Sequence, residues 1–408
     1  MRQHFQSRFV ERIEALARLS ESPDYLVRPS FTPSMKRANA LVGDWMRAAG
    51  MSVHEDAVGN LIGRYEGTTP DAKAVLIGSH IDTVIDAGKY DGTLGVLLGL
   101  ACVEELAVQG KRLQAAIEVI AFCDEEGLRY KLSFVGSRAL AGVLSHEHLE
   151  LEDADGVPLK RAMVDYGGLP PFAPEGRNPS GLIGYLEAHI EQGPVLESAG
   201  VPVGIVSGIQ GLNRFEVVFS GEAGHAGTVP MPLRRDALVA AARFIVAVQE
   251  TARATEGLVA TVGQIQALPG ASNAIPGRAV LSLDLRHMEE ATRRSAIASI
   301  SAQAAEIAER ERVGLRWTEI TDTAATPCSP QIMEALSASA RALGVPTKTL
   351  ASGAGHDAVM ISRIAPVGML FVRCKDGISH NPAEYCSPVD AETAADVILG
   401  AIEALSLP

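Results

Sequence analysis

The sequence has few cysteines and no arrangement of them that suggests a disulfide-linked protein. It contains five, an odd number, and none belongs to a Cys-x-x-Cys pair. They are Cys102, Cys123, Cys328, Cys374 and Cys386. A scattered, odd set of this kind argues against a disulfide framework and fits a reducing compartment.

Long hydrophobic runs are also missing. The longest apolar stretch, Leu94 to Val103, is flanked by Asp91 and Glu104 and has about half the length that a membrane helix needs. The N-terminal residues lack the apolar core of a signal peptide. We therefore expect a soluble, cytoplasmic protein that does not bind a membrane.

Positive charge is scarce in this chain. Its 408 residues include 36 Lys and Arg but 49 Asp and Glu, which gives a net charge of −13. This balance argues against nucleic acid or an anionic membrane as a partner. A small anionic substrate stays open, because local arginines can override the average field. The 47% of hydrophobic residues is a globular composition, and the length predicts two or three domains of roughly 150 residues.

The first half of the chain alternates helix-like and strand-like segments. The pattern predicts helices at 8–20, 35–49 and 92–108, strands at 74–78, 117–123 and 203–206, a helix-like stretch at 182–189 and an exposed connection at 152–180. Strand, helix and strand in this order predict a parallel or mixed α/β sheet.

A different pattern begins near residue 209 and ends near residue 323. It predicts strands at 215–219, 259–266, 280–286 and 315–320, with helices at 233–251 and 289–312. The order βαββαβ is the split-βαβ pattern of a ferredoxin-like domain. The α/β pattern then resumes with helices at 330–343, 356–363 and 388–405 and a strand at 366–372. We expect one domain made of residues 1–208 and 324–408, interrupted by a second domain at 209–323.

Imidazole and carboxylate side chains follow two of the predicted strands. His80 and Asp82 come directly after the first strand, Asp91 follows them, and the paired Glu125 and Glu126 come after the second. Catalytic groups gather at strand ends of α/β sheets. Imidazole and carboxylate groups bind metal ions, and two ions can share a bridging Asp. The pattern predicts a metal site in which one of the paired glutamates is a ligand and the other a general base.

Each of these motifs alone has a simpler interpretation. The pair His80 and Asp82 could be a capping arrangement, Asp91-Gly92 a turn, and the acidic triplet that ends at Glu126 the start of a helix. Their combination after core strands is what favours a metal site.

Two of the remaining histidines, His189 and His380, add imidazoles with polar neighbours, which the surroundings of a metal site need. By contrast, the nearby pair His146 and His148 lies in a charged stretch. We interpret that pair as the solvated start of a helix.

Seven motifs lie along nearly the whole chain. They are Gly-Ser-His80-Ile-Asp82-Thr, Gly-Lys-Tyr-Asp91-Gly92, Glu125-Glu126-Gly, His189-Ile-Glu-Gln192-Gly-Pro-Val-Leu-Glu, Gly-His225-Ala-Gly-Thr-Val-Pro-Met, Gly-Ala-Gly-His356-Asp357-Ala and Gly-Ile-Ser-His380-Asn-Pro-Ala-Glu384. In combination they resemble the metal-dependent amidohydrolases of the M20 metallopeptidase clan, in the hydantoinase/carbamoylase branch. That branch includes N-carbamoyl-L-amino acid hydrolases, allantoate amidohydrolases and bacterial β-ureidopropionases.

The resemblance implies a di-metal exopeptidase-like catalytic domain with a mixed sheet, interrupted by a ferredoxin-like lid and dimerisation domain. It implies two divalent ions, which can be Zn, Mn, Co or Ni, with Asp91 as the bridging ligand. The implied ligands are His80, Asp91, Glu126, His189 and His380. It also implies that Glu125 is the general acid/base and that Asp82 orients His80.

The resemblance further implies a set of substrate-side residues. Asn273 and Arg286 would grip the substrate carboxylate, for which a guanidinium suits bidentate binding. Gln192 would lie near the ureido group, with Gly355 and His356 lining the same site. His225 would reach the active site of a neighbouring subunit in a homodimer and stabilise the oxyanion there.

The function implied is hydrolysis of a ureido C–N bond in an N-carbamoyl-L-amino acid or in allantoate, with release of ammonia and carbon dioxide. One alternative is a dipeptidase or aminoacylase of the same clan, against which Gly92, Gln192 and Asn273 speak. Another is a non-catalytic binding protein on this fold, which would be expected to lose the base or a ligand. Arg373 stands where relatives are expected to have Pro-Ser. It either alters substrate preference or is simply exposed, and we favour exposure.

Overall fold

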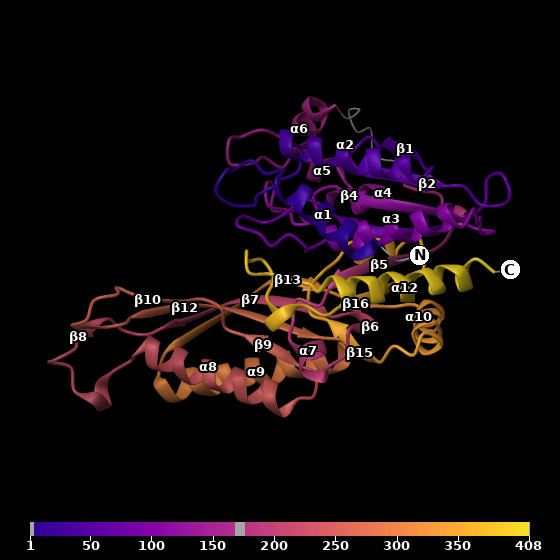
Figure 1. The fold of residues 1–408 in the computed structure, drawn as a ribbon. Coiled ribbons are helices and arrows are strands. Elements are labelled where there is room, and N and C mark those ends of the chain that lie inside the picture. The colour runs from indigo at the N-terminus through magenta and orange to yellow at the C-terminus, as the bar shows by residue number, and fades with distance from the viewer. Residues whose placement is uncertain (1–3, 168–175, 408) are drawn as a thin grey trace. The chain divides into compact units, whose positions relative to one another are not determined.

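The computed structural model describes residues 4–167 and 176–407. Within these ranges no helix is long and apolar enough to cross a membrane. The chain forms two compact units, which consist of Met1–Ser207 with Cys328–Pro408 and of Gly208–Pro327 (Figure 1). The lid and dimerisation role of the second unit stays a prediction.

The first unit is built on a mixed sheet. Its strands are β1 (Ser52–Glu55), β2 (Leu61–Tyr65), β3 (Ala74–His80), β4 (Ala116–Phe122), β5 (Leu182–Ile190), β6 (Val203–Ile209), β15 (Thr347–Ser352) and β16 (Val367–Val372). They lie in the order β1-β2-β4-β3-β5-β16-β6, with β15 and the short β14 (Thr326–Pro327) beside β6. Strands β4, β3, β5 and β16 are mutually parallel, whereas β2 and β6 run antiparallel to their neighbours. The predicted mixed α/β sheet is confirmed.

Helices cover this sheet. They are α1 (Phe5–Ala17), α2 (Pro33–Ala48), α3 (Thr93–Val108), α4 (Val135–Leu140), α5 (His146–Leu149), α6 (Leu159–Tyr166), α7 (Val195–Ala199), α10 (Pro330–Ala342), α11 (Ala358–Ile361) and α12 (Pro388–Leu405), with single 3₁₀ turns at Pro179–Gly181 and Lys375–Gly377. Helices α1, α3 and α12 contact one another, and α3 also contacts β3 and β5. This approach is close because α3 has a glycine at its contact point: a Cβ added to Gly95 would lie 2.2 Å from the carbonyl oxygen of Ala188.

Most predicted elements are present, but several predictions were wrong. Residues 182–189 were predicted to be helix-like, whereas they belong to the central strand β5. Strands β1, β2 and β15 were not predicted, and the helix expected at 356–363 is the shorter α11. The connection expected at 152–180 contains α6, and its residues 168–175 lie outside the described part of the chain. His146 and His148 do start a short helix, α5, which Ser145 caps.

The second unit contains a five-stranded antiparallel sheet, a separate two-stranded pair and two long helices. Its elements are β7 (Gly211–Ser220), β8 (Gly224–His225), a 3₁₀ turn (Met231–Leu233), α8 (Ala237–Ala254), β9 (Val259–Thr261), β10 (Ile265–Leu268), β11 (Ala274–Ile275), β12 (Arg278–His287), α9 (Glu290–Glu311) and β13 (Gly314–Thr323). The strand order is β10-β12-β7-β13, and β9 also pairs with β12. Thus the predicted strand 259–266 is split into β9 and β10.

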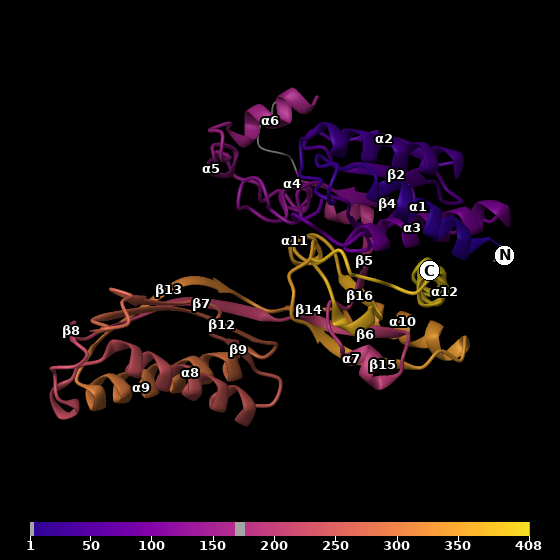
Figure 2. The ribbon, with the colours of Figure 1, turned by 60° about the vertical axis from the view of Figure 1, so that its left-hand side comes forward.

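One face of this sheet is covered by α8 and α9, as Figure 2 shows. Along β12 the residues alternate between buried and half-buried, because every second side chain points to the helices. Phe219, Phe244 and Leu283 lie in the resulting core.

Glu118 is a buried carboxylate in the middle of β4 and is 3% exposed. It accepts hydrogen bonds from Arg64 at 2.7 Å and from Arg177 at 2.6 and 2.8 Å. Burial acts to raise the pKa of Glu118, but the two guanidinium groups outweigh it and hold the pKa below its ordinary value. The charged form of Glu118 therefore stabilises the fold.

We expect Glu118→Gln to lower the free energy of unfolding by about 1–3 kcal/mol at pH 7. The folded-state pKa is the lower one, so this contribution is complete above the unfolded-state pKa of about 4.3. It is lost as the pH falls through the folded-state pKa. Denaturant unfolding of both proteins at neutral and acid pH measures it. A gap between them that does not shrink in acid would contradict the electrostatic explanation.

Candidate metal centre

Four neighbouring strands bring the candidate ligands to one edge of the first sheet. His80 is the last residue of β3, Glu125 and Glu126 follow β4, His189 is near the end of β5, and His380 lies beyond β16. These strands are parallel, so their carboxyl ends meet at the same edge. Asp91 reaches this edge from the loop between β3 and α3.

Asp91 lies at the centre of the cluster. Its Oδ1 is 3.0 Å from Nε2 of His189 and 3.6 Å from Nε2 of His80. Its Oδ2 is 3.2 Å from Nε2 of His380, which in turn lies 3.6 Å from Oε1 of Glu126. Among the described residues the donor atoms form three groups, each within 4.8 Å: His80 with Asp91 and His189, Asp91 with Glu126 and His380, and His80 with Glu125 and Glu126. The first two groups share Asp91, one on each of its oxygens.

This donor set fits divalent metal ions. Imidazole nitrogens and carboxylate oxygens are ligands of Zn, Mn, Co and Ni, and a shared carboxylate is the usual bridge of a two-metal site. Burial acts to raise the pKa of Asp91. The charge of His189 and the hydrogen bonds with His189, His380 and His80 outweigh burial and hold this pKa well below its ordinary value. Asp91 is therefore ionised, as a bridging ligand has to be.

Glu125 belongs to the third group, with His80 and Glu126. Its Oε2 is 3.8 Å from Nε2 of His80, and the residue is 7% exposed. Burial raises the pKa of Glu125 well above its ordinary value against the opposing charge of His80, and repulsion from Glu126 adds to the rise. A carboxyl group whose pKa is raised in this way is suited to carry a proton in one step and release it in another.

Backbone carbonyl groups orient two of the histidines. Nδ1 of His80 lies 3.0 Å from the carbonyl oxygen of Asp82, and Nδ1 of His189 lies 2.9 Å from that of Ile190. A carbonyl oxygen only accepts, so each Nδ1 carries the proton and each Nε2 presents its lone pair to the cluster. The Asp82 carboxylate is farther from His80 Nδ1, at 3.7 Å, and instead accepts the N–H groups of Glu125 and Glu126.

The other expected residues of the first unit lie at different depths. Gln192 donates from Nε2 to Asp91 Oδ2 at 3.0 Å, so it reaches the cluster directly. His356 is 1% exposed, with its ring centroid 4.6 Å from that of His189 and its Nε2 2.9 Å from Ser352 Oγ, whereas Gly355 is exposed. His356 therefore packs behind a candidate ligand, and its contact with substrate stays a prediction.

The expectation that Arg373 is simply exposed was wrong. Its guanidinium is half-buried and donates to both carboxylate oxygens of Asp390, at 3.0 Å each. Asp390 lies in the first turn of α12, where the helix dipole favours a negative charge. The ion pair explains Arg373 without any contact with substrate.

The three substrate-binding residues expected in the second unit, His225, Asn273 and Arg286, do not lie together in one copy of that unit. His225 in β8 pairs with Ala274 in β11, so Asn273 is its close neighbour, at the end of the sheet where β12 begins with Arg278. Arg286 lies near the opposite end of β12, where it donates to both oxygens of Asp284. The distance from Arg278 to Arg286 along the strand is roughly 25 Å, at the usual rise of about 3.3 Å per residue.

Ser379 and Glu384 are polar residues near Asp91 to which we had assigned no role from the motifs. Ser379 Oγ lies 3.0 Å from Asp91 Oδ2 and 3.0 Å from Glu384 Oε2. Both residues belong to the sequence motif of His380. Their position close to that histidine in the sequence could have indicated that they lie near the metal site.

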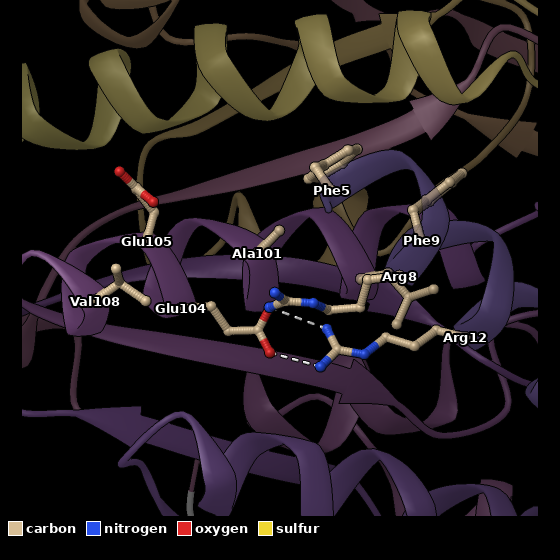
Figure 3. A pocket seen from close by; sticks show the side chains of 9 residues that line it. Phe5, Arg8, Phe9, Arg12, Ala101, Glu104, Glu105 and Val108 are labelled. Atoms are coloured by element: carbon tan, nitrogen blue, oxygen red, sulfur yellow. Dashed lines mark hydrogen bonds and ion pairs between the residues drawn. The ribbon is translucent and has the colours of Figure 1, made fainter. Parts of the chain in front are cut away.

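A separate pocket lies between α1 and α3 (Figure 3). Phe5, Phe9 and Ala101 form part of its wall, and Arg8 and Arg12 both bind Glu104 there. None of the expected site residues lines this pocket, and its two arginines are paired with Glu104. We therefore place the functional site at the Asp91 cluster.

Residues 76–404 match the model of peptidase family M20/M25/M40. The chain belongs to the M20 peptidase family. It is 44% identical, over 96% of each chain, to N-carbamoyl-L-amino acid amidohydrolase of Geobacillus stearothermophilus. It is 37% identical to the allantoate deiminase of Arabidopsis thaliana, over 97% of this chain and 81% of that one. The resemblance noted from the motifs is confirmed.

Solved structures agree with this membership. The crystal structure of an amidase of the hydantoinase/carbamoylase family from Burkholderia multivorans matches with a TM-score of 0.94, at 33% identity and over 98% of each chain. The aminopeptidase PepT of Bacillus cereus matches with a TM-score of 0.67 at 17% identity, which is a likeness of fold alone.

Gly92 separates Asp91 from α3 and lies against the His80 ring. Its φ is +62°, and an added Cβ would lie 2.3 Å from Nε2 of His80. A side chain at this position would therefore displace the ring of a candidate ligand. This geometry gives a physical reason for a glycine at position 92.

We expect Gly92→Ala to weaken binding of divalent metal by roughly 10- to 100-fold, since it disturbs the orientation of His80. Titration with Co²⁺, followed by its absorption spectrum, measures the affinity. Gly110→Ala is a matched control, because Gly110 has a φ of +64° but no atom within 4 Å of an added Cβ. Both variants carry a similar backbone strain of about 1 kcal/mol. Equal affinities for Co²⁺ in the two variants would contradict this account of Gly92.

Proposed function

We propose that this protein hydrolyses the ureido C–N bond of an N-carbamoyl-L-amino acid. One water is consumed, and the products are the amino acid, ammonia and carbon dioxide. The observation that carries the proposal is the Asp91-centred donor cluster in a chain 44% identical to a protein named for this reaction. Its chemistry suits the cleavage of an amide-type bond.

We assign the metal ligands as His80, Asp91, Glu126, His189 and His380, which would hold two divalent ions. Such ions, when bound, polarise a carbonyl oxygen and lower the pKa of water. Glu125 takes a proton from the attacking water and delivers it to the departing nitrogen. This delivery matters because an amine anion is a poor leaving group.

Allantoate is the second candidate substrate. Plant proteins named allantoate deiminase are 37% identical over 97% of this chain. Allantoate and the carbamoyl amino acids both present a carboxylate beside a ureido group, so one pocket design serves both. A dipeptide or an N-acetyl amino acid would fit the alternative within the clan, and a binding protein would turn over none of them.

The substrate class is tested by ammonia release from the metal-loaded protein. N-carbamoyl-L-amino acids, N-carbamoyl-β-alanine and allantoate would be compared, with a dipeptide and an N-acetyl amino acid followed by amine release. We expect turnover of ureido compounds alone, with the carbamoyl amino acids fastest. Turnover of only the dipeptide or the acetyl compound would refute the ureido assignment.

Glu125→Gln should retain the metal ions but lower kcat by roughly 10²-fold or more, because the amide cannot transfer the proton. Metal analysis beside steady-state kinetics measures both effects. The neighbouring Glu126→Gln is the control and should lose metal, since Glu126 is assigned as a ligand. Loss of metal from Glu125→Gln would instead make Glu125 a ligand.

We further propose that the active form is a homodimer in which each site uses residues from both copies. His225 and Asn273 lie near one end of the second unit's sheet and Arg286 near the other. The separation of roughly 25 Å, from the rise of a strand, is much longer than a carbamoyl amino acid. A single copy therefore cannot place both ends of this unit on one substrate molecule.

Mixing two inactive variants tests this arrangement. His225→Ala and Arg286→Ala should each lose most activity as pure proteins. After dissociation and random reassembly, half of the dimers are mixed and one site of each is intact, so activity should return to roughly a quarter of wild type. The control is a mixture of the two variants that is not dissociated, so that no subunits are exchanged. No recovery in reassembled dimers would contradict the shared site.

A further inference from the structure

Glu384 holds the backbone that carries Asp91. It is 2% exposed, and its Oε1 accepts the N–H groups of Tyr90 at 2.8 Å and of Asp91 at 3.1 Å. Two successive N–H groups on one carboxylate oxygen fix the direction of the peptide between them. Packing tightens the arrangement, because a Cβ added to Gly88 would lie 2.2 Å from the Glu384 carboxyl group.

The second oxygen of Glu384 is connected to the Asp91 carboxylate through Ser379. Ser379 Oγ is 3.0 Å from Glu384 Oε2 and 3.0 Å from Asp91 Oδ2. Gln192 Nε2 lies 3.0 Å from Asp91 Oδ2 and 3.1 Å from Ser379 Oγ. Ser379 thus links the Glu384 side chain to Asp91 Oδ2, and Gln192 contacts both Ser379 and that same oxygen, which faces His380.

The hydrogen-bond donors of Gln192 and Ser379 are enough to satisfy these contacts. The Gln192 amide has two N–H groups, and the Ser379 hydroxyl has one O–H. Gln192 can donate to Asp91 and to Ser379, which leaves the Ser379 proton for Glu384. Each acceptor oxygen then receives one hydrogen bond, and a chain of hydrogen bonds runs from Asp91 Oδ2 through Gln192 and Ser379 to Glu384.

This chain connects two segments that are distant in sequence. Ser379, His380 and Glu384 lie in the loop after β16, whereas Asp91 lies before α3. His380 has a φ of +53°, a conformation that non-glycine residues adopt only when their surroundings impose it. Glu384 thus ties the loop of one candidate ligand to the loop of another.

We propose that Glu384 and Ser379 are positioning residues, which set the relative geometry of Asp91 and His380 and so build the group of Asp91, Glu126 and His380. The proposal rests on the metal site assigned under the proposed function. A bridging carboxylate has to present both oxygens at fixed places. Gln192 and Ser379 fix one of those oxygens, and Glu384 fixes the backbone behind it.

Glu384→Gln tests the proposal with little change of shape. Its amide oxygen can still accept the Tyr90 and Asp91 N–H groups, but its NH₂ cannot accept the Ser379 proton. We expect a Co²⁺ absorption titration to show one of two metal equivalents weakened by roughly 10- to 100-fold. With the preferred ureido substrate, kcat should fall while KM changes less than about threefold.

Ser379→Ala breaks the same chain at a smaller residue, and so tests the proposal if Glu384→Gln does not fold. The double variant Ser379→Ala/Glu384→Gln should bind Co²⁺ no more weakly than the worse single variant, because both changes interrupt one chain. Glu118→Gln is the matched control. It alters an equally buried glutamate of the same unit, and should lower Tm without changing the Co²⁺ titration.

The titration separates this proposal from the proposed function. Wild-type protein that binds two equivalents of Co²⁺ but hydrolyses no ureido compound would refute the function, while the variants still test Glu384 and Ser379. A wild-type Co²⁺ titration for both single variants would overturn the positioning role, whatever the substrate. So would fully additive losses of affinity in the double variant.

Discussion

The two oxygens of the Asp91 carboxylate organise the edge of the first sheet. One oxygen faces His80 and His189, and the other faces His380, Gln192 and Ser379. A buried carboxylate is costly unless it is paired and hydrogen-bonded, and here each oxygen has its own partners. The strands that meet at this edge, the loop that carries His380 and the glycine at position 92 all serve to place groups around one short side chain.

The surroundings of Asp91 contain more acids than bases. Asp82, Asp124, Glu125, Glu187 and Asp357 are all buried near the cluster, and burial raises the pKa of each. Three histidines cannot neutralise so many carboxyl groups if all of them ionise. Cations at the Asp91 cluster would relieve this repulsion, which is a physical reason for a metal site independent of any relative.

The ligands at the strand ends were predictable from sequence because the sequences of β3 and β4 clearly indicate strands. His80 and Glu125 follow apolar runs of seven or fewer residues, and such short runs bounded by polar turns indicate buried strands. The same reasoning failed for β5, which was predicted to be helix-like. Its sequence is not one continuous apolar run, because Gly184, Glu187 and His189 interrupt it, and the mixed pattern then resembles a helix. Glu187, inside this strand, is satisfied by Ser79 and by the N–H of Ala358, two partners that no local pattern reveals.

The connections among the ligands were beyond sequence reasoning for another physical reason. Ser379 and Gln192 meet Asp91 across separations of 288 and 101 residues, so only the folded sheet brings them together. Gln192 and His380 also have positive φ values, 58° and 53°, which local propensity does not favour. Arg373 shows the same limit, since its sequence neighbours do not reveal the pairing with Asp390 in α12.

The geometry of the second unit constrains function in a way that its composition does not. Helices α8 and α9 pack on one face of the sheet, and the ten residues of β12 keep the two ends of that strand well apart. If residues at both ends contact one carbamoyl amino acid, as we propose, two copies of the unit have to approach it. In the proposed homodimer the second unit would therefore join two active sites. A monomer would then keep the Asp91 cluster but lack part of the groups proposed to recognise the substrate.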